Sequence, residues 1–578
     1  MKCVLKELKY FKKELLLIIL TVAGTTLCTL GLPTLMTRLI DRAIPEGNYL
    51  HVIEIFGLML LMVAVAILCG VVTSAQSAKV SMGVGRNLRS SIFRKVQYFS
   101  QTEIDSFTTS SLITRTNNDI NQVQVFLNQC LRIAFQAPIM CIFGVILAIR
   151  QSPSLSVVLV VSIPLMAVVL TIIGKLAVPL SQSIQTKIDR INLVMREKLT
   201  GVRVIRAFGT SDFESKKFEA INKDYQKTNM KMQRTTNSVL PVLTIILSAT
   251  AALVMLMAAN QSVNKGIDYT VGEVMAIIQY VMLIMMAVIM LTMVFIMLPR
   301  AATSASRVKE VLDTECSIQN KEDCLDNNLQ KGYLTFKNVS FTYPGADVPA
   351  IRNLSFEAKP GETTAIIGGT GMGKSTIVNL IPRLYDVTEG QVLVDGIDVR
   401  DYDTAVLRNK IGFVPQKAVL FAGTIDSNIA FGDVKPSEDR IEEAVKIAQS
   451  YDFVMKKEEG FEAPISQGGT NVSGGQRQRL AIARAIVRKP EIYVFDDSFS
   501  ALDFKTDKAL RTALSKETDN ATVVIVAQRI STIMDADRII VVEKGEVAGI
   551  GTHDELLKTC EVYKEIVDSQ LSKEEQTK

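Results

Sequence analysis

Long apolar runs alternate with charged segments over the first 300 residues of the chain. Six runs contain no Asp, Glu, Lys or Arg, and they are between 17 and 30 residues long. They cover residues 15–37, 55–78, 133–149, 151–174, 235–264 and 274–299. Because about 20 helical residues cross the hydrocarbon core of a bilayer, each run predicts a membrane-spanning helix.

The segments between these runs predict long cytoplasmic extensions. Residues 79–132 and 175–234 form the two long gaps, and both carry apolar residues at three- and four-residue spacing, which is typical of amphipathic helices. The first long gap contains seven Lys or Arg residues and the second thirteen, whereas the opposite side has only Arg38, Arg42, Arg150 and Lys265. Because basic residues accumulate on the cytoplasmic side, we expect a multi-pass protein of the plasma membrane with both termini in the cytoplasm.

The pattern changes at about residue 331, where short β-rich runs begin to alternate with helical ones. Examples are EIYVFDD at 491–497 and ATVVIVAQ at 521–528, with a helical stretch at 475–489 before them. This alternation predicts an α/β domain with a largely parallel sheet. We therefore expect an α-helical membrane domain at 1–310, a linker at 311–330 and an α/β domain at 331–578.

Composition and charge exclude several classes of protein. Hydrophobic residues make up 48% of the chain and the mean hydropathy is +0.25, which excludes a purely soluble, disordered or collagen-like protein. The net charge of +5 is too small for this length to indicate a nucleic-acid partner. Only two histidines are present, His51 and His553, so a multi-histidine metal site is excluded.

A phosphate-binding loop is the strongest chemical motif in the chain. Residues 368–375 read GGTGMGKS, which fits the pattern G-x-x-x-x-G-K-[ST], after a predicted strand at 365–367 and before a predicted helix at 376–384. Its glycines allow backbone N–H groups to turn toward phosphates, and the helix N-terminus adds partial positive charge. We expect Lys374 to reach the β- and γ-phosphates and Ser375 to bind Mg²⁺.

A second part of this site is expected at the end of a buried strand. The apolar residues 492–495 are followed by Asp496 and Asp497. A carboxylate at the end of such a strand is suited to hold Mg²⁺ through water, and the presence of the phosphate-binding loop strengthens this interpretation.

Further strings resemble those of the ATP-binding cassette (ABC) family. Residues 471–479, NVSGGQRQR, resemble the family's signature motif. Tyr343 in SFTYPG resembles the residue that stacks on adenine, Gln416 in GFVPQ the Q-loop, and SALD at 500–503 the D-loop. LITRTNNDI at 112–120 and LTGVRVIRAFGTSDFE at 199–214 resemble two cytoplasmic loops of six-span ABC exporters.

This resemblance implies a half-transporter that pairs with a second chain. Each ATP would lie between the phosphate-binding loop of one chain and the signature motif of the other, and coupling helices near 104–110 and 202–212 would dock on the nucleotide domains. ATP and Mg²⁺ are the implied cofactors, with Ser375, Gln416 and Asp496 as the Mg²⁺ residues. The implied nucleotide-binding residues are Tyr343, Gly368, Gly369, Thr370, Gly371, Met372, Gly373, Lys374, Ser375, Thr376, Gln416, Ser473, Gly474, Gly475, Gln476, Asp496 and Asp503.

Two catalytic positions depart from the family pattern. The family follows the Mg²⁺ aspartate with a Glu that polarises water, but Asp497 stands here; a switch histidine normally follows the next strand, but Gln528 stands here. Asp is one methylene shorter than Glu, and a displacement of about 1 Å can cost on the order of 10²-fold in rate. We therefore expect this chain's own site to bind ATP and to hydrolyse it poorly.

The nearly intact signature motif suggests a different partner chain. Val472 replaces the usual Leu, whereas Ser473, Gly474, Gly475 and Gln476 are retained. The combination resembles the degenerate-site subunit of heterodimeric bacterial multidrug exporters, whose partner carries the Glu and the His. A slow homodimer is the alternative assembly. Alternative functions are a lipid, peptide or thiol exporter subunit, and a nucleotide-gated regulator that transports nothing.

The sixth apolar run is rich in methionine. Seven methionines occur in it, at positions 275, 282, 285, 286, 290, 293 and 297, and Gln279 accompanies them. Flexible thioether side chains suit surfaces that bind varied amphipathic molecules, and a polar residue within a span usually faces the protein interior. Ordinary lipid-facing or core packing is the alternative explanation for the methionines.

Overall fold

The computed structural model describes residues 1–578 except 266–267, 322, 325–330, 434 and 571–578. Two compact units form: residues 1–97 with 109–314, and residues 98–108 with 315–578. Residues 322 and 325–330 of the predicted linker therefore lie outside the described part. We call the first the membrane unit and the second the nucleotide unit, and each is described by itself.

In the described residues of the membrane unit, helices are joined by short turns and no strand occurs. Six of its helical stretches are long and apolar enough to cross a membrane, which confirms the six predicted spans. The short helices are α1 (Lys2–Leu8), η1 (Lys9–Phe11), η2 (Leu39–Ala43), α5 (Thr109–Thr114), η3 (Arg115–Asp119) and α8 (Val202–Ala207). The long helices are α2 (Lys12–Arg38), α3 (Tyr49–Gln97), α6 (Ile120–Gln151), α7 (Pro153–Thr200), α9 (Ser211–Asn237), α10 (Val239–Lys265) and α11 (Val271–Asp313).

The two long polar gaps are helical, as their periodicity predicts. α3 continues 19 residues beyond the apolar run that ends at residue 78, and α7 continues 26 residues beyond the run that ends at residue 174. The single-residue gap at Arg150 lies within α6, and the turn follows at Ser152. Ser152 has extended backbone angles and Pro153 occupies the first helical position, where its missing N–H costs nothing.

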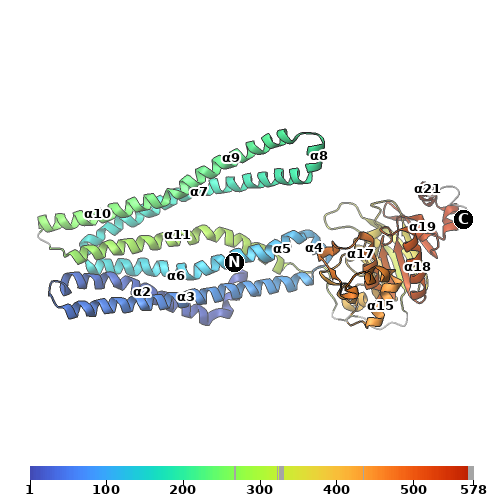
Figure 1. The fold of residues 1–578 in the computed structure, drawn as a ribbon, viewed down its shortest axis with the longest axis horizontal. Coiled ribbons are helices and arrows are strands. Elements are labelled where there is room, and N and C mark those ends of the chain that lie inside the picture. The colour runs from blue at the N-terminus through green and yellow to red at the C-terminus, as the bar shows by residue number, and fades with distance from the viewer. Residues whose placement is uncertain (266–267, 322, 325–330, 434, 571–578) are drawn as a thin grey trace. The chain divides into compact units, whose positions relative to one another are not determined.

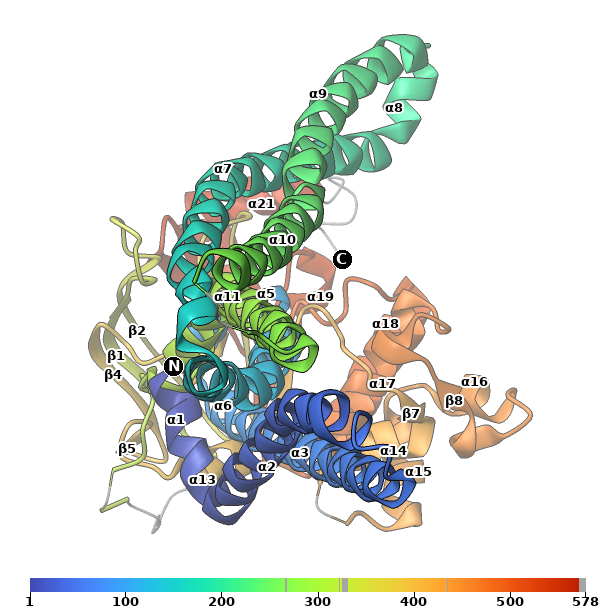
Figure 2. The ribbon, with the colours of Figure 1, turned by 90° about the vertical axis from the view of Figure 1, so that its left-hand side faces the viewer.

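α7 and α9 form a hairpin with α8 at its tip, and the tip projects away from α2, α3 and α6 of the same unit (Figures 1 and 2). Large apolar side chains are exposed at this tip, including Val204, Phe208 and Phe213. α8 falls within the 202–212 segment where a coupling helix is expected.

The nucleotide unit contains a six-stranded sheet of order β12-β11-β3-β10-β9-β6. Its strand pairs are parallel except for β11 with β12. A second sheet, of order β2-β1-β4-β5, is antiparallel. The strands are β1 (Leu334–Phe341), β2 (Ile351–Ala358), β3 (Thr363–Ile367), β4 (Glu389–Val394), β5 (Ile397–Asp398), β6 (Ile411–Val414), β7 (Gly423–Thr424), β8 (Pro464–Ile465), β9 (Ile492–Asp496), β10 (Thr522–Val526), β11 (Arg538–Glu543) and β12 (Glu546–Gly551).

The α/β class and the largely parallel main sheet are as predicted, but the antiparallel sheet was not. Its strands β1 and β2 alternate buried and exposed residues, because one face packs on the core while the other faces outward. The helices of this unit are α4 (Gln101–Phe107), α12 (Lys374–Leu380), α13 (Thr404–Asn409), α14 (Ile425–Ala430), α15 (Glu438–Ile447), α16 (Tyr451–Met455), η4 (Gly460–Glu462), η5 (Gln467–Gly469), α17 (Gly474–Ile486), α18 (Phe504–Glu517), α19 (Ile530–Ile533), α20 (His553–Thr559) and α21 (Glu561–Gln570).

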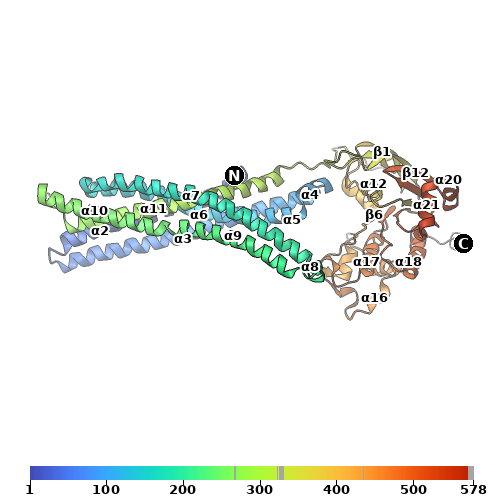
Figure 3. The same cartoon turned by 90° about the horizontal axis from the view of Figure 1, so that it is seen from above.

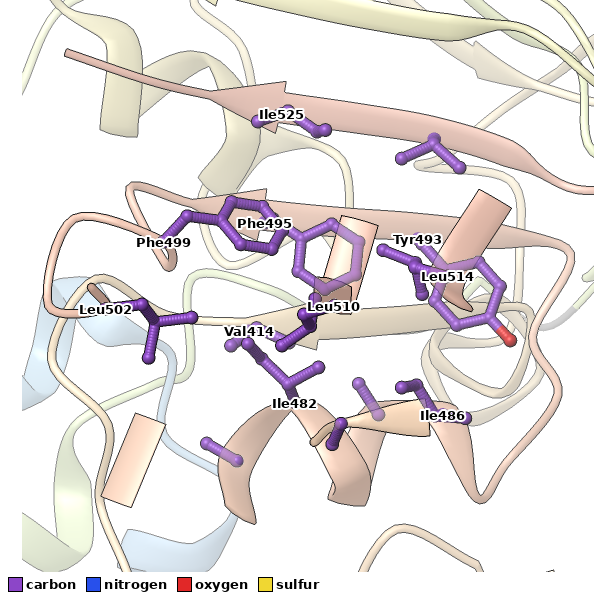
Figure 4. Packing of buried hydrophobic residues seen from close by; sticks show 14 of the residues in the cluster. Val414, Ile482, Ile486, Tyr493, Phe495, Phe499, Leu502, Leu510, Leu514 and Ile525 are labelled. Atoms are coloured by element: carbon purple, nitrogen blue, oxygen red, sulfur yellow. The ribbon is translucent and has the colours of Figure 1, made fainter. Parts of the chain in front are cut away.

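A hydrophobic core supports the ends of the central strands. Tyr493 and Phe495 of β9 point toward α17 and α18, where they pack with Ile482 and Leu510 (Figure 4). These side chains are almost completely buried, so they fix the strand that carries Asp496 and Asp497.

The short helix α4 belongs to the nucleotide unit although it lies between α3 and α5 in the sequence. It overlaps the 104–110 segment where a coupling helix is expected, but it ends at Phe107 because Thr108 has φ +61°. Its N-terminus is closed by a capping box between Ser100 and Glu103.

Candidate nucleotide site

The phosphate-binding loop lies between β3 and α12. Two of its glycines allow close backbone approach: a Cβ at Gly368 would lie 2.2 Å from the carbonyl oxygen of Val542, and one at Gly373 would lie 2.7 Å from that of Ala350. Gly373 also has φ +87°, which favours glycine. The helix begins at Lys374 rather than at 376, and it ends at Leu380 rather than at 384; Ile381 still has helical backbone angles, but Pro382 has no N–H to continue the helical hydrogen bonds.

Lys374 lies over its own loop. Its Nζ donates hydrogen bonds to the carbonyl oxygens of Gly368 (2.8 Å) and Gly369 (2.6 Å). Burial lowers the pKa of this ammonium group, and the charges of Asp497 and Asp496 oppose that effect. The side chain is therefore held at the loop, where its charge is available to a phosphate.

Ser375 and Asp496 provide a pair of oxygen ligands suited to Mg²⁺. The hydroxyl of Ser375 donates to Oδ1 of Asp496 at 3.0 Å. Burial raises the pKa of Asp496, the hydrogen bond from Ser375 lowers it, and the charge of Asp497 raises it. Mg²⁺ prefers oxygen ligands and keeps several waters, so this pair fits the ion, which would supply positive charge beside the phosphates.

Asp497 accepts hydrogen bonds from two glutamine side chains. Nε2 of Gln528 lies 2.9 Å from its Oδ2, and Nε2 of Gln416 lies 3.3 Å from the same oxygen. The structure therefore places Asp497 and Gln528, the two departures from the family pattern, side by side. It also places Gln416 beside Asp497, although Gln416 is expected to bind Mg²⁺. An oxygen that already accepts two amide donors has little capacity left to accept a proton from water.

The backbone of Asp497 is strained, in addition to the hydrogen bonds that its side chain accepts. Its φ is +47°, a left-handed conformation that non-glycine residues adopt rarely, and its N–H donates to the carbonyl oxygen of Val526 at 3.0 Å. The hydroxyl of Ser500 donates to the carbonyl oxygen of Asp497 at 2.9 Å. Burial raises the pKa of the carboxyl group, while hydrogen bonding by Gln416 and Ser500 lowers it.

The signature motif forms the exposed N-terminus of α17. Ser473 is the N-cap: its Oγ accepts from the N–H of Gln476 (3.2 Å), and its own N–H donates to Oε1 of Gln476 (3.0 Å). A Cβ at Gly474 would meet no atom within 4 Å, whereas one at Gly475 would approach the carbonyl oxygen of Ala501 at 3.2 Å. Figure 3 shows α12 and α17 in different parts of the unit.

Tyr343 is half-buried and makes side-chain contacts within the unit. Its hydroxyl lies 2.9 Å from Oγ1 of Thr376, and its ring contacts Phe341 and Tyr385 edge to face, at centroid distances of 4.8 and 5.4 Å. Sequence reasoning missed Tyr385, because no motif connects it with the phosphate-binding loop.

The remaining expected residues lie around these groups. Asp503 caps α18 by accepting from the N–H of Thr506 at 3.0 Å. The sulfur of Met372 accepts from the N–H of Lys544 at 3.2 Å, while Thr370 and Gly371 are exposed on the loop. Nδ1 of His553 is hydrogen-bonded to the hydroxyl of Tyr563 (2.7 Å), and Nδ1 of His51 is hydrogen-bonded to Oε2 of Glu46 (3.0 Å). Neither histidine therefore takes the position of Gln528.

Two family models match the chain. One describes the ABC transporter transmembrane region and covers residues 15–288; the other describes the ABC transporter and covers residues 351–500.

Relatives match almost the whole chain. An uncharacterized ABC transporter ATP-binding protein of Mycobacterium tuberculosis is 38% identical over 569 residues, covering 98% of this chain and 97% of the relative. A second uncharacterized ABC transporter ATP-binding protein, YfiB of Bacillus subtilis, is 37% identical over 542 residues and covers 94% of each chain. An ATP-dependent lipid A-core flippase of Salmonella typhimurium is 32% identical over 513 residues, covering 89% and 87%.

A solved structure has the same fold. A bacterial Atm1-family ABC exporter with ATP bound superposes with a TM-score of 0.82 over 98% of this chain and 100% of that one, at 24% identity.

Proposed function

The chain belongs to the ABC transporter family, and from that premise we propose that it is one of two different subunits of a multidrug exporter. Its six spans and its nucleotide-binding domain make it an ATP-hydrolysing ABC exporter half-transporter and a multi-pass membrane protein. The proposal concerns the partner, the division of work between two ATP sites, and the substrate, which we take to be an amphipathic, drug-like compound.

The contact between Gln528 and Asp497 is the observation that carries the proposal. Hydrolysis requires a base or a polarising carboxylate within hydrogen-bond reach of the attacking water. The side chain of Asp497 is one methylene shorter than that of Glu, and its Oδ2 accepts hydrogen bonds from both Gln528 and Gln416. Gln528 brings no positive charge to a γ-phosphate. This chain's own site therefore retains ATP and turns it over slowly.

The signature motif supports a competent site on the partner. The N-terminus of α17 carries the exposed Ser473 and Gly474, and the 13-residue helix adds partial positive charge there. The serine hydroxyl would donate to the γ-phosphate, and Gly474 would allow close backbone approach. A chain that lacks the catalytic Glu and His but retains the signature motif would form a competent site with a partner chain that carries both residues.

The substrate class is inferred from a methionine stripe on α11. Met275, Met282, Met286 and Met293 are spaced by 7, 4 and 7 residues, which places them on one helical face, and each side chain is between 45% and 58% exposed. Unbranched thioether side chains adapt to varied apolar surfaces. Met285, in contrast, is buried and packs in the membrane-unit core.

Lipid export is the second candidate. A relative that matches 89% of this chain is named an ATP-dependent lipid A-core flippase, and the methionine stripe also suits acyl chains. The two candidates share an amphipathic substrate, so a transport assay with both kinds of probe distinguishes them.

The experiment is affinity purification of the tagged full-length chain from its native membranes, followed by transport in proteoliposomes. We expect a second half-transporter with Glu and His at the corresponding positions to co-purify, and the pair to accumulate ethidium in an ATP-dependent manner. Movement of a fluorescent lipid without ethidium uptake would support the lipid candidate. Recovery of two tagged copies of this chain, without another half-transporter, would contradict the heterodimer.

A further inference from the structure

Tyr385 lies between Tyr343 and α4, and it contacts both. Its side chain is 7% exposed, and its ring lies 5.4 Å from that of Tyr343 at an interplanar angle of 84°. Its hydroxyl donates to Oδ2 of Asp105 at 2.9 Å. Asp105 and Tyr385 are 280 positions apart in the sequence, yet both belong to the nucleotide unit.

Tyr343 is joined to the phosphate-binding helix at the other end of this chain of contacts. Its hydroxyl lies 2.9 Å from Oγ1 of Thr376, the residue that follows Ser375 in α12. A tyrosine side chain has only two main torsions, so its ring and hydroxyl cannot move independently. A nucleotide base that packed on Tyr343 and moved its ring would therefore alter both the contact of that ring with Tyr385 and the contact of its hydroxyl with Thr376.

α4 is fastened to the nucleotide unit by a small number of polar contacts. Oε1 of Glu103 accepts from the N–H of Ser317 at 3.1 Å, and the hydroxyls of Ser100 and Ser317 lie 2.8 Å apart. Burial raises the pKa of Glu103, but hydrogen bonds from Ser100 and Ser317 outweigh it and hold that pKa below its usual value. These bonds hold the N-terminal turn, and Asp105, two residues after Glu103, provides a further contact.

We propose that Tyr385 is the positioning residue through which the base of a bound purine nucleotide, stacked on Tyr343, sets the position of α4. The inference rests on the proposed ATP binding at the phosphate-binding loop. It adds a specific route: Thr376 in α12 contacts Tyr343, Tyr343 contacts Tyr385, and Tyr385 contacts Asp105 in α4. Two of its links are hydrogen bonds and the central one is an edge-to-face ring contact.

The test measures hydrogen exchange of the α4 amides in the full-length chain in nanodiscs, with and without ATP and Mg²⁺, beside fluorescent-nucleotide binding. In the unaltered chain we expect ATP to change exchange over residues 101–107 by about tenfold. Tyr385→Phe keeps the ring and removes the hydroxyl. We expect it to reduce the ATP-dependent change to less than about twofold, with nucleotide affinity within about threefold, because a hydrogen bond to a carboxylate is lost outside the phosphate site.

Two further variants separate this role from a merely structural one. Asp105→Asn retains an oxygen that accepts from Tyr385, so it should keep most of the ATP response, whereas Asp105→Ala should lose it. Tyr563→Phe is the matched control, because it removes a tyrosine hydroxyl bonded to His553 instead. It should respond like the unaltered chain.

The inference would be overturned if Tyr385→Phe showed the same ATP-dependent change in α4 exchange as the unaltered chain. It would also be overturned if the unaltered chain bound ATP without any change in α4 exchange. Absence of nucleotide binding in the unaltered chain would overturn the proposed function as well, and the binding measurement reports that outcome separately.

Discussion

Nε2 of Gln528 donates a hydrogen bond to Oδ2 of Asp497 over 2.9 Å, so the two residues that we propose to stand in place of a catalytic Glu and His are hydrogen-bonded to each other. They follow β10 and β9, which are parallel neighbours with Val526 opposite Asp496. This register brings both side chains to the same sheet edge. The bond occupies an acceptor that a catalytic carboxylate would offer to water.

Restoring both family residues should increase hydrolysis at this chain's own site. Asp497→Glu extends the carboxylate by a methylene, and Gln528→His removes the amide donor and adds a group that can carry positive charge. We expect the double variant, purified without a partner, to turn over ATP on the order of 10²-fold faster than the unaltered chain. Steady-state phosphate release measures this, with Asp497→Asn/Gln528→His as the control without a carboxylate. Equal rates for the double variant and this control would contradict the assignment of Asp497.

Removing the phosphate-directed lysine should weaken ATP retention more than it slows the paired transporter. In Lys374→Ala, loss of a charged contact costs about 2–3 kcal/mol, or roughly 30- to 200-fold in affinity. Turnover of the proposed pair should fall only in part, because its competent site would use the phosphate-binding loop of the other chain. Nucleotide retention and steady-state turnover are compared with Lys337→Ala, an exposed lysine on β1. Complete loss of turnover in Lys374→Ala would argue against two unequal sites.

Enlarging Gly474 should block the competent site without unfolding this chain. A Cβ there meets no atom within 4 Å in the chain, so the added atoms interfere only with whatever approaches from outside. We expect turnover of the pair to fall progressively through Gly474→Ala, Gly474→Ser and Gly474→Gln, with unchanged thermal unfolding. Near-normal activity of Gly474→Gln would show that no nucleotide closes on this signature motif.

The orientation of the membrane unit can be tested with single cysteines in a cysteine-free chain. An impermeant maleimide applied to intact cells should label a cysteine at Glu46, in the turn between η2 and α3. It should label a cysteine at Lys216, in α9, only after the cells are permeabilised, because the long basic gaps are expected in the cytoplasm. Labelling at Lys216 in intact cells would refute this topology.

Sequence alone was sufficient where a physical signal was local. The absence of charge over each apolar run predicts the spans, and the spacing of GGTGMGKS predicts a phosphate-binding loop. The antiparallel sheet was not predicted because its strands pair across distant segments of the sequence, as β1 does with β4. The contact between Tyr385 and Asp105 was not predicted either, because these residues are 280 positions apart. The sequence shows Asp497 and Gln528 at these positions, but their mutual hydrogen bond depends on the register of β9 and β10.

Binding of ATP at a site that hydrolyses it poorly is tested most directly on the pure chain, without a partner. A fluorescent ATP analogue reports binding, and phosphate release from ATP reports turnover in the same preparation. We expect saturable, Mg²⁺-dependent binding that Lys374→Ala weakens, together with turnover far below about 1 s⁻¹, the lower end of usual enzyme rates. Robust turnover by the pure chain would contradict both the weak site and the need for a different partner.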